Sequence, residues 1–203
     1  MKKWFTPYGF AGVPRLMGEF GYEQTADIKQ AHMVVFTGGS DINPALYGQK
    51  PHRTTWWHED RDKLEVETFH RTRELGLPMF GICRGAQLIC ALNGGSLWQH
   101  TNHHDSHPCF NTDGEFMFTV SSLHHQMCRP NQDNCNNIGF AKNLSSVFVD
   151  EETEIDGHLP FGSEPELMYH HNINALCVQG HPEFMESQAP FVKWCDKFIK
   201  EKM

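Results

Sequence analysis

The sequence predicts an α/β fold, in which one domain holds a mostly parallel central sheet flanked by helices. Two dense apolar runs, Met33–Phe36 and Met79–Ile82, have the composition of strands that are buried on both faces. A charged helical segment separates them, as in the β-α-β units that build parallel sheets. A glycine loop at residues 37–41 follows the first run, and a strand-to-helix turn at Cys83 follows the second. In open α/β sheets this carboxyl edge is where ligands bind.

The first half of the chain supplies the first strands and helices of this sheet. Residues 3–6 predict a short strand, and residues 14–20 carry apolar side chains at helical spacing. The next helix is predicted over residues 59–75, where opposite charges lie four residues apart. Gly76 and Pro78 then mark its end.

The second half predicts shorter strands and a last helix. Residues 116–120 alternate weakly, as an antiparallel edge strand does, and residues 147–149 form another short strand. Residues 166–169 and 175–179 predict two more. An amphipathic helix begins at Pro190, with apolar residues recurring at i, i+3, i+4, i+7 and i+8. Three polar segments are predicted as loops: residues 98–109, 130–137 and 150–156.

Length and charge exclude several classes of protein. The 203 residues (1–203) are expected to form one domain with a full core. A net charge of −8, with no basic stripe, argues against a nucleic-acid or anionic-membrane partner. The N-terminal apolar runs are brief, so neither a signal peptide nor a membrane span is expected. Seven scattered cysteines favour a reducing compartment, and we expect a cytoplasmic protein.

The strongest candidate nucleophile is Cys83, which lies between Gly81 and Gly85. Gly-x-Cys-x-Gly between a strand and a helix is the cysteine version of the nucleophile elbow, in which small neighbours allow a sharp turn. The N-terminus of the following helix favours a thiolate. The alternative is a buried core cysteine, the usual fate of a free thiol. His181 ends a predicted strand at the same edge of the sheet, and Glu183 follows two residues later, within reach of its imidazole.

These residues also carry a family resemblance. GICRGAQ (residues 81–87) and VQGHPE (residues 178–183) resemble the class I glutamine amidotransferase superfamily, whose cysteine attacks a γ-glutamyl amide. GGSDINPALYG, Arg61-Asp62, CRG and SSLHHQ are similar to its gamma-glutamyl-gamma-aminobutyrate hydrolase branch, of the gamma-glutamyl hydrolase-type cysteine peptidases. The matches run in family order from residue 38 to residue 183. The resemblance implies the flavodoxin-like class I amidotransferase fold.

The resemblance also assigns roles in catalysis. Cys83 matches the nucleophile, His181 the general base and acid, and Glu183 the carboxylate that orients the imidazole. The backbone amides of Gly39 and Arg84 match the oxyanion hole, where the amide carbonyl becomes negative. No metal and no organic cofactor are implied.

Three further residues match groups that hold the glutamyl head of the substrate: Gln87, Leu123 and His124. The implied enzyme is a C–N hydrolase acting on glutamine or a γ-glutamyl amine. One alternative is a glutaminase subunit that passes ammonia to a separate synthetase partner. The segments over residues 101–116 and 129–144 depart from the family pattern, and we expect them to border the leaving group.

Other features have readings unrelated to this chemistry. The group His100, His103, His104 and His107 fits either a solvated loop or a zinc-binding, non-enzymatic interaction module. Trp56-Trp57 predicts a patch at the mouth of the site or a contact in a homodimer. Three cysteines are assigned to the core, namely Cys90, Cys177 and Cys195. Three others fall in predicted loops without a role, namely Cys109, Cys128 and Cys135.

Overall fold

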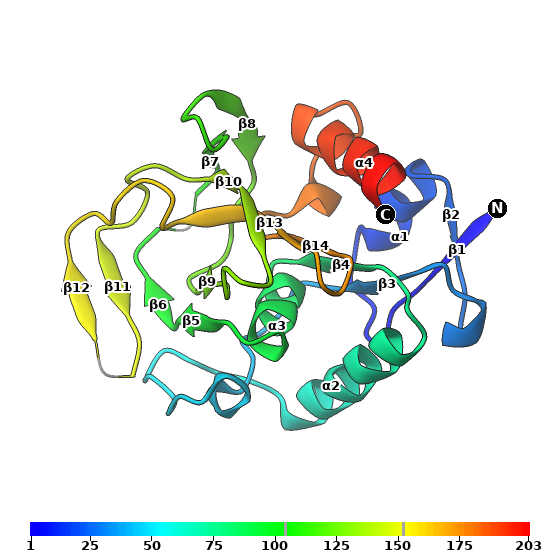
Figure 1. Cartoon of the computed structure of the whole chain (residues 1–203), viewed down its shortest axis with the longest axis horizontal. Coiled ribbons are helices and arrows are strands. Elements are labelled where there is room, and N and C mark those ends of the chain that lie inside the picture. Colours follow the sequence, from blue (N-terminus) through cyan, green and yellow to red (C-terminus); the bar gives the residue numbers. More distant parts are fainter. Residues whose placement is uncertain (104, 152) are drawn as a thin grey trace.

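The computed structural model describes residues 1–103, 105–151 and 153–203. A nine-stranded mixed sheet crosses this part of the chain (Figure 1). Its strands, in spatial order, are β2 (Tyr22–Gln24), β1 (Lys2–Phe5), β3 (Met33–Phe36), β4 (Met79–Ile82), β14 (Ala175–Val178), β13 (Pro165–His170), β10 (Asn136–Phe140), β7 (His107–Phe110) and β8 (Phe116–Val120).

The sheet divides into a parallel half and an antiparallel half. Pairing is parallel from β2 through β1, β3 and β4 to β14, and antiparallel from β14 through β13, β10 and β7 to β8. The predicted α/β class is confirmed, but parallel pairing covers only half of the sheet. The antiparallel share is larger than expected because β7 and β10 lie in segments predicted as loops.

Helices cover both faces of the parallel half. They are α1 (Val13–Glu19), α2 (Glu59–Glu74), α3 (Arg84–Leu92) and α4 (Pro190–Lys202), with 3-10 turns η1 (Ile28–Gln30), η2 (Pro44–Tyr47) and η3 (Pro182–Phe184). Side chains of α1 and α4 pack in one hydrophobic core, and those of α2 and α3 pack in a second. The strands divide between the two cores by alternation: Val35 enters the first core, and Val34 and Phe36 enter the second.

Two smaller sheets lie beyond the antiparallel half. β6 (His100–Thr101), β11 (Val147–Val149) and β12 (Glu154–Asp156) form one, and β5 (Ser96–Trp98) pairs with β9 (Met127–Arg129) in the other. In Figure 1, β11 and β12 lie at the end of the molecule farthest from the N-terminus. The predicted loops over residues 98–109, 130–137 and 150–156 are therefore wrong in part, since strands occupy portions of each.

The four α-helices and four of the five parallel strands match the sequence prediction, whereas β2 was not predicted. The helix predicted over residues 59–75 is α2, and the amphipathic pattern beginning at Pro190 is α4. The edge strand predicted over residues 116–120 is β8, which pairs antiparallel with β7. None of the helices in the described ranges combines the length and apolar character that a membrane span needs.

Candidate active site

Cys83 lies at the turn from β4 into α3 with a backbone geometry that few side chains adopt. Its φ of 49° and ψ of −108° fall outside the ordinary regions, a strain of about 1–3 kcal/mol. A Cβ atom at Gly85 would lie 2.1 Å from the carbonyl oxygen of Phe36, and one at Gly81 would lie 2.9 Å from the amide nitrogen of Ala86. Only glycine fits at both positions, so the elbow predicted from the sequence is present.

Hydrogen bonds from two elements hold this strained residue. The amide of Cys83 donates to Val178 of the neighbouring strand at 2.8 Å, and the amide of Gln87 donates to the Cys83 carbonyl at 3.0 Å. The Cys83 side chain therefore lies at the N-terminus of α3. The helix dipole there favours a negative charge on the sulfur.

The other six cysteines lie in a different environment. Cys83 is 6% exposed, whereas each of the others is 2% exposed or less. The core assignment of Cys90, Cys177 and Cys195 is confirmed. The loop assignment of the remaining three is wrong for two of them, because Cys109 lies on β7 and Cys128 on β9. Burial raises the pKa of five of these thiols: Cys109, Cys128, Cys135, Cys177 and Cys195.

His181 and Glu183 form the contact that the sequence predicts. Nδ1 of His181 lies 2.8 Å from Oε1 of Glu183, and both side chains are buried. Burial by itself lowers the pKa of His181. The hydrogen bonds and negative charges of Cys83 and Glu183 outweigh burial and raise this pKa to about 10. The imidazole is therefore charged at neutral pH, between the sulfur and the carboxylate.

The local cause of this contact differs from the sequence argument. Strand alternation was expected to put the two residues on one side, but Glu183 lies in η3, a 3-10 turn for which His181 is the N-cap. The backbone of His181 is also anchored, since its amide donates to Oγ of Ser121 at 3.0 Å and its carbonyl accepts from that hydroxyl at 2.8 Å. The ring of Phe184 stacks on the imidazole at 5.2 Å between centroids.

Both predicted oxyanion donors lie next to this constellation. Arg84 is the first residue of α3, where backbone amides have no partner within the helix. Gly39 belongs to the loop after β3, and its φ of 144° is a conformation that favours glycine. A Cβ atom at Gly38 would lie 2.8 Å from Cε1 of His181, so this loop packs directly against the imidazole.

A buried charged cluster lies behind these donors, and sequence reasoning missed it. It contains four side chains, which are Arg61, Asp62, Glu65 and Arg84. The charge pattern of residues 59–75 was read as helix-stabilising pairing. Position in the helix could have distinguished these residues from the exposed charge pairs, because Arg61, Asp62 and Glu65 lie on one side of the helix near its N-terminus.

The three residues predicted to hold the glutamyl head are placed differently from one another. Gln87 is buried, and its side chain donates to the carbonyl of Gln126 at 3.3 Å. Leu123 is 67% exposed. His124 is buried, with Nδ1 bonded to the carbonyl of Gln126 at 2.9 Å. Its imidazole therefore faces the interior, so at His124 only the backbone is available to a ligand, whereas the side chain of Leu123 is exposed.

The described members of the histidine group, His100, His103 and His107, do not form one metal site. His107 is buried on β7, where Nε2 lies 3.0 Å from Oε1 of the fully buried Glu166, and His124 contributes a second imidazole at 3.6 Å. His100 lies on β6 with its ring 5.9 Å from that of His125, and His103 bonds to a backbone carbonyl. The solvated-loop prediction is thus wrong for His107.

His104 lies outside the described residues. Among the residues that are described, no group of three or more His, Cys, Asp and Glu side chains is arranged to hold a metal ion.

Trp56 is exposed, as a surface patch requires, and its amide donates to Asp41 at 2.9 Å.

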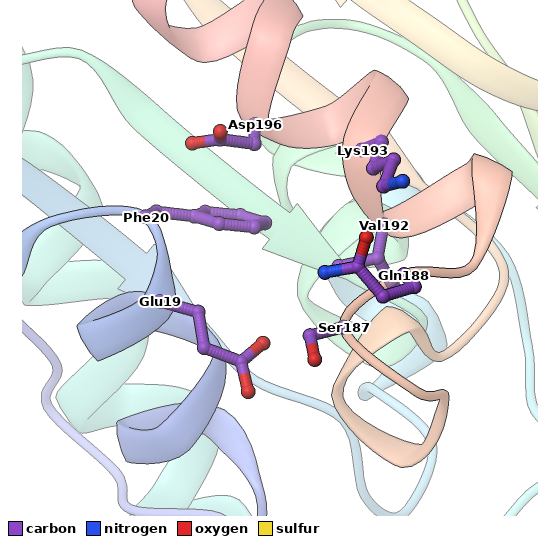
Figure 2. A pocket seen from close by; sticks show the side chains of 7 residues that line it. All are labelled: Glu19, Phe20, Ser187, Gln188, Val192, Lys193 and Asp196. Carbon is purple, nitrogen blue, oxygen red and sulfur yellow. The ribbon is translucent and has the colours of Figure 1, made fainter.

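A pocket of about 400 Å³ opens on another part of the molecule (Figure 2). It lies between α1 and α4 and is lined by Glu19, Phe20, Ser187, Gln188, Val192, Lys193 and Asp196. None of the residues predicted for the site contributes to it. Its lining holds neither a cysteine nor a histidine, so the predicted cysteine chemistry is placed at the edge of the sheet.

Comparisons with known proteins agree with this geometry. The family model of peptidase C26 matches residues 17–183. A stretch of 70 residues is 43% identical to "Putative glutamine amidotransferase Rv2859c" of Mycobacterium tuberculosis, and covers 34% of this chain and 23% of that protein. A longer stretch of 121 residues is 31% identical to "Protein NtpR" of Enterococcus hirae, and covers 51% of this chain and 50% of that protein. The chain spans about a quarter to a half of the length of these curated relatives.

Solved structures share the fold along the whole chain. One is a "putative gmp synthase subunit a protein" from Thermoplasma acidophilum, with a TM-score of 0.62, 15% identity, and coverage of 98% of this chain and 96% of that chain. Another is a glutamine amidotransferase from Thermotoga maritima, with a TM-score of 0.56, 11% identity, and coverage of 98% and 83%. At these identities the likeness establishes the fold.

Proposed function

This chain belongs to the peptidase C26 family and is an enzyme of the hydrolase and glutamine amidotransferase group, and from that premise we propose that it hydrolyses a γ-glutamyl amide bond through a thioester on Cys83. The observation that carries the proposal is the buried contact between Nδ1 of His181 and Oε1 of Glu183, at 2.8 Å, at the same sheet edge as the elbow of Cys83. Hydrogen bonds to Cys83 and Glu183 outweigh burial and raise the pKa of this imidazole. A charged imidazole beside a cysteine at a helix N-terminus is the arrangement that favours a reactive thiolate.

The reaction proceeds in two steps. The Cys83 thiolate attacks the amide carbon, and the amides of Gly39 and Arg84 bind the oxygen as it becomes negative. His181 gives its proton to the leaving nitrogen as the C–N bond breaks, which releases ammonia or an amine and leaves a thioester. The neutral imidazole then takes a proton from water, whose oxygen attacks the thioester. Glutamate leaves and the thiolate is restored. Glu183 orients the imidazole in both steps and stabilises it whenever it is protonated.

The γ-glutamyl specificity is the finer part of the proposal. Its support is the motif similarity over residues 38–183 and the arrangement of Gln87 with the turn at residues 121–126. Since His124 faces the interior, we assign the recognition of the glutamyl head to the side chain of Gln87 and the backbone of Leu123 and His124. The exposed side chain of Leu123 is then available to the leaving group.

A second version of this chemistry is an ammonia-donating subunit with a synthetase partner. It is favoured by the likeness in fold to two solved structures, one titled a glutamine amidotransferase and the other a "putative gmp synthase subunit a protein". Such a subunit gains nothing from hydrolysing glutamine alone and is expected to be silent until its partner docks.

We also propose that residues 1–203 act as one domain in a reducing, cytoplasmic compartment, because all seven cysteines are free thiols.

Turnover of the isolated chain separates the two versions. The purified protein is incubated with glutamine, γ-glutamyl-aminobutyrate and γ-glutamyl-putrescine, and glutamate release is measured, with Cys83→Ala as the inactive control. The proposed hydrolase releases glutamate from at least one γ-glutamyl amine faster than from glutamine. Silence on all three substrates, while Cys83 still reacts with iodoacetamide, rejects the free-standing hydrolase and leaves the partner-dependent subunit.

A further inference from the structure

Four charged side chains are buried together directly behind the predicted oxyanion hole. Arg61, Asp62 and Glu65 come from the first turns of α2, and Arg84 from the start of α3; each is 7% exposed or less. Glu65 bonds to both guanidinium groups, and Asp62 bonds to Arg84 and accepts from the amide of Asn43 at 2.8 Å. Two positive and two negative charges balance, which buried ionic groups require.

One member of the cluster reaches beyond it to the glycine loop. Nη2 of Arg61 donates to the carbonyl oxygen of Gly38 at 2.9 Å and to that of Thr37 at 3.2 Å. The Gly38 carbonyl and the Gly39 amide belong to one planar peptide, so the N–H must point away from the guanidinium. A Cβ atom at Gly39 would lie 2.2 Å from Nη1 of Arg61, while Gly38 packs against His181. The peptide that carries one oxyanion donor is therefore held between Arg61 and the imidazole.

The second donor is attached to the same two turns of α2. The backbone amide of Arg84 follows Cys83 directly, while its fully buried side chain bonds to Asp62 and Glu65. Arg61 is oriented in turn by Glu65, at 3.2 Å from both Nε and Nη2. Glu65 thus bonds to both arginines. Arg61 holds the Gly38–Gly39 peptide, and Arg84 supplies the other amide.

We infer that the Arg61–Asp62–Glu65–Arg84 cluster is a positioning device that fixes both oxyanion donors before substrate binds, so that the isolated chain is competent without a partner. The inference rests on the proposed function and deepens it. An oxyanion hole contributes to rate only when its donors are oriented in advance, and losing one donor costs about 10²–10³-fold in kcat. The hydrogen bonds of Arg61 go to Glu65 and to the loop residues Thr37 and Gly38, so the inference assigns its effect to the peptide that it holds.

The test compares two conservative substitutions on the same helix. Arg61→Lys keeps the charge of the cluster but loses the planar fork, so one ammonium cannot serve Glu65 and two carbonyl oxygens in the same geometry. Arg71→Lys is the matched control, because Arg71 forms a largely exposed pair with Glu74. For each variant, kcat and KM for a γ-glutamyl amine, the alkylation rate of Cys83 and the melting temperature are measured.

The expected result is a kcat lowered about a hundredfold in Arg61→Lys, with KM and the alkylation rate of Cys83 unchanged and Arg71→Lys at the wild-type level. A wild-type kcat in Arg61→Lys overturns this inference and leaves the proposed hydrolase standing. A parallel fall in alkylation overturns it too, because Arg61 would then act through the thiolate. An inactive wild-type chain refutes both the inference and the free-standing hydrolase.

A measurement on the wild-type chain covers the case in which Arg61→Lys fails to fold. A γ-glutamyl aldehyde adds to Cys83 as a hemithioacetal, whose oxygen occupies the oxyanion position. The crystal structure of this adduct is expected to show that oxygen bound by the amides of Gly39 and Arg84, with Arg61 on the Gly38 carbonyl. A Gly38–Gly39 peptide turned away from the oxygen contradicts the inference.

Discussion

Replacing Glu183 by glutamine tests how the charge of His181 is maintained. The two side chains are buried and joined at 2.8 Å, and a hydrogen bond to a charged group contributes about 1.5–3 kcal/mol. One pKa unit corresponds to about 1.36 kcal/mol, so loss of the carboxylate charge lowers the pKa of His181 by about one to two units. Because this pKa is raised to about 10 in the wild type, the variant loses its imidazolium at a lower pH.

The assay is glutamate release by Glu183→Gln across the neutral to alkaline range. His181 must be protonated to release the amine, so activity falls as pH rises through its pKa. We expect this alkaline limb to move down by about one to two pH units. Near neutral pH the imidazole keeps its proton, and we expect kcat there to fall about 10–100-fold because glutamine orients the imidazole less well and gives its charge no support in the transition state. His181→Ala is expected to lose about 10²–10⁴-fold.

Glu186→Gln is the matched control, since Glu186 is an exposed carboxylate just beyond the same turn. It is expected to leave both the limb and kcat unchanged. An unshifted limb in Glu183→Gln would show that Glu183 does not support the imidazolium. An unchanged kcat would remove Glu183 from the mechanism.

Three further predictions concern the nucleophile, the elbow and a buried ion pair. Iodoacetamide near neutral pH should label Cys83 before the other six cysteines, which peptide mass spectrometry would reveal; earlier labelling of another thiol would refute the elbow assignment. Gly85→Ala forces a Cβ atom against the Phe36 carbonyl, so urea unfolding should show a loss of about 1–3 kcal/mol or more, and an unchanged midpoint would contradict this packing. Burial by itself raises the pKa of Glu166 and lowers that of His107, but the facing imidazoles of His107 and His124 outweigh burial and lower the pKa of Glu166 to about 2, while Glu166 raises the pKa of His107. The pairing therefore stabilises the fold above the unfolded pKa of the glutamate and below that of the histidine. Glu166→Gln should therefore lose most stability between about pH 4.5 and about pH 6.5 in urea titrations, and a pH-independent loss would be evidence against the ion pair.

The parallel half of the fold and its edge could be predicted from the sequence because their signals are local. Met33–Phe36 and Met79–Ile82 are apolar on both faces, and each is a strand with the predicted bounds. The motif of Cys83 between two glycines predicts a sharp strand-to-helix turn, and the structure has this turn. The His181–Glu183 contact followed from two residues of separation, although a 3-10 turn and not a strand produces it.

In the antiparallel half, β8 and β13 were predicted from the sequence, but β7 and β10 were not, because they are short, polar and stabilised by distant partners. β7 contains His107 and Pro108, and its buried imidazole lies 3.0 Å from Glu166, which is far along the chain. β10 begins in an asparagine-rich segment that composition assigns to a loop. The charges of α2 were misread for a similar reason, since only the tertiary contact with Arg84 distinguishes a buried pair from an exposed one.

The most direct test of the central claim is the identity of the covalent intermediate. The wild-type chain is mixed with γ-glutamyl-aminobutyrate, quenched in acid during the first turnovers, digested and analysed by mass spectrometry. The account predicts one glutamyl group on the peptide that contains Cys83, formed and lost within turnover and absent from Cys83→Ala. Glutamate release without this adduct, or with the glutamyl group on another cysteine, would contradict it.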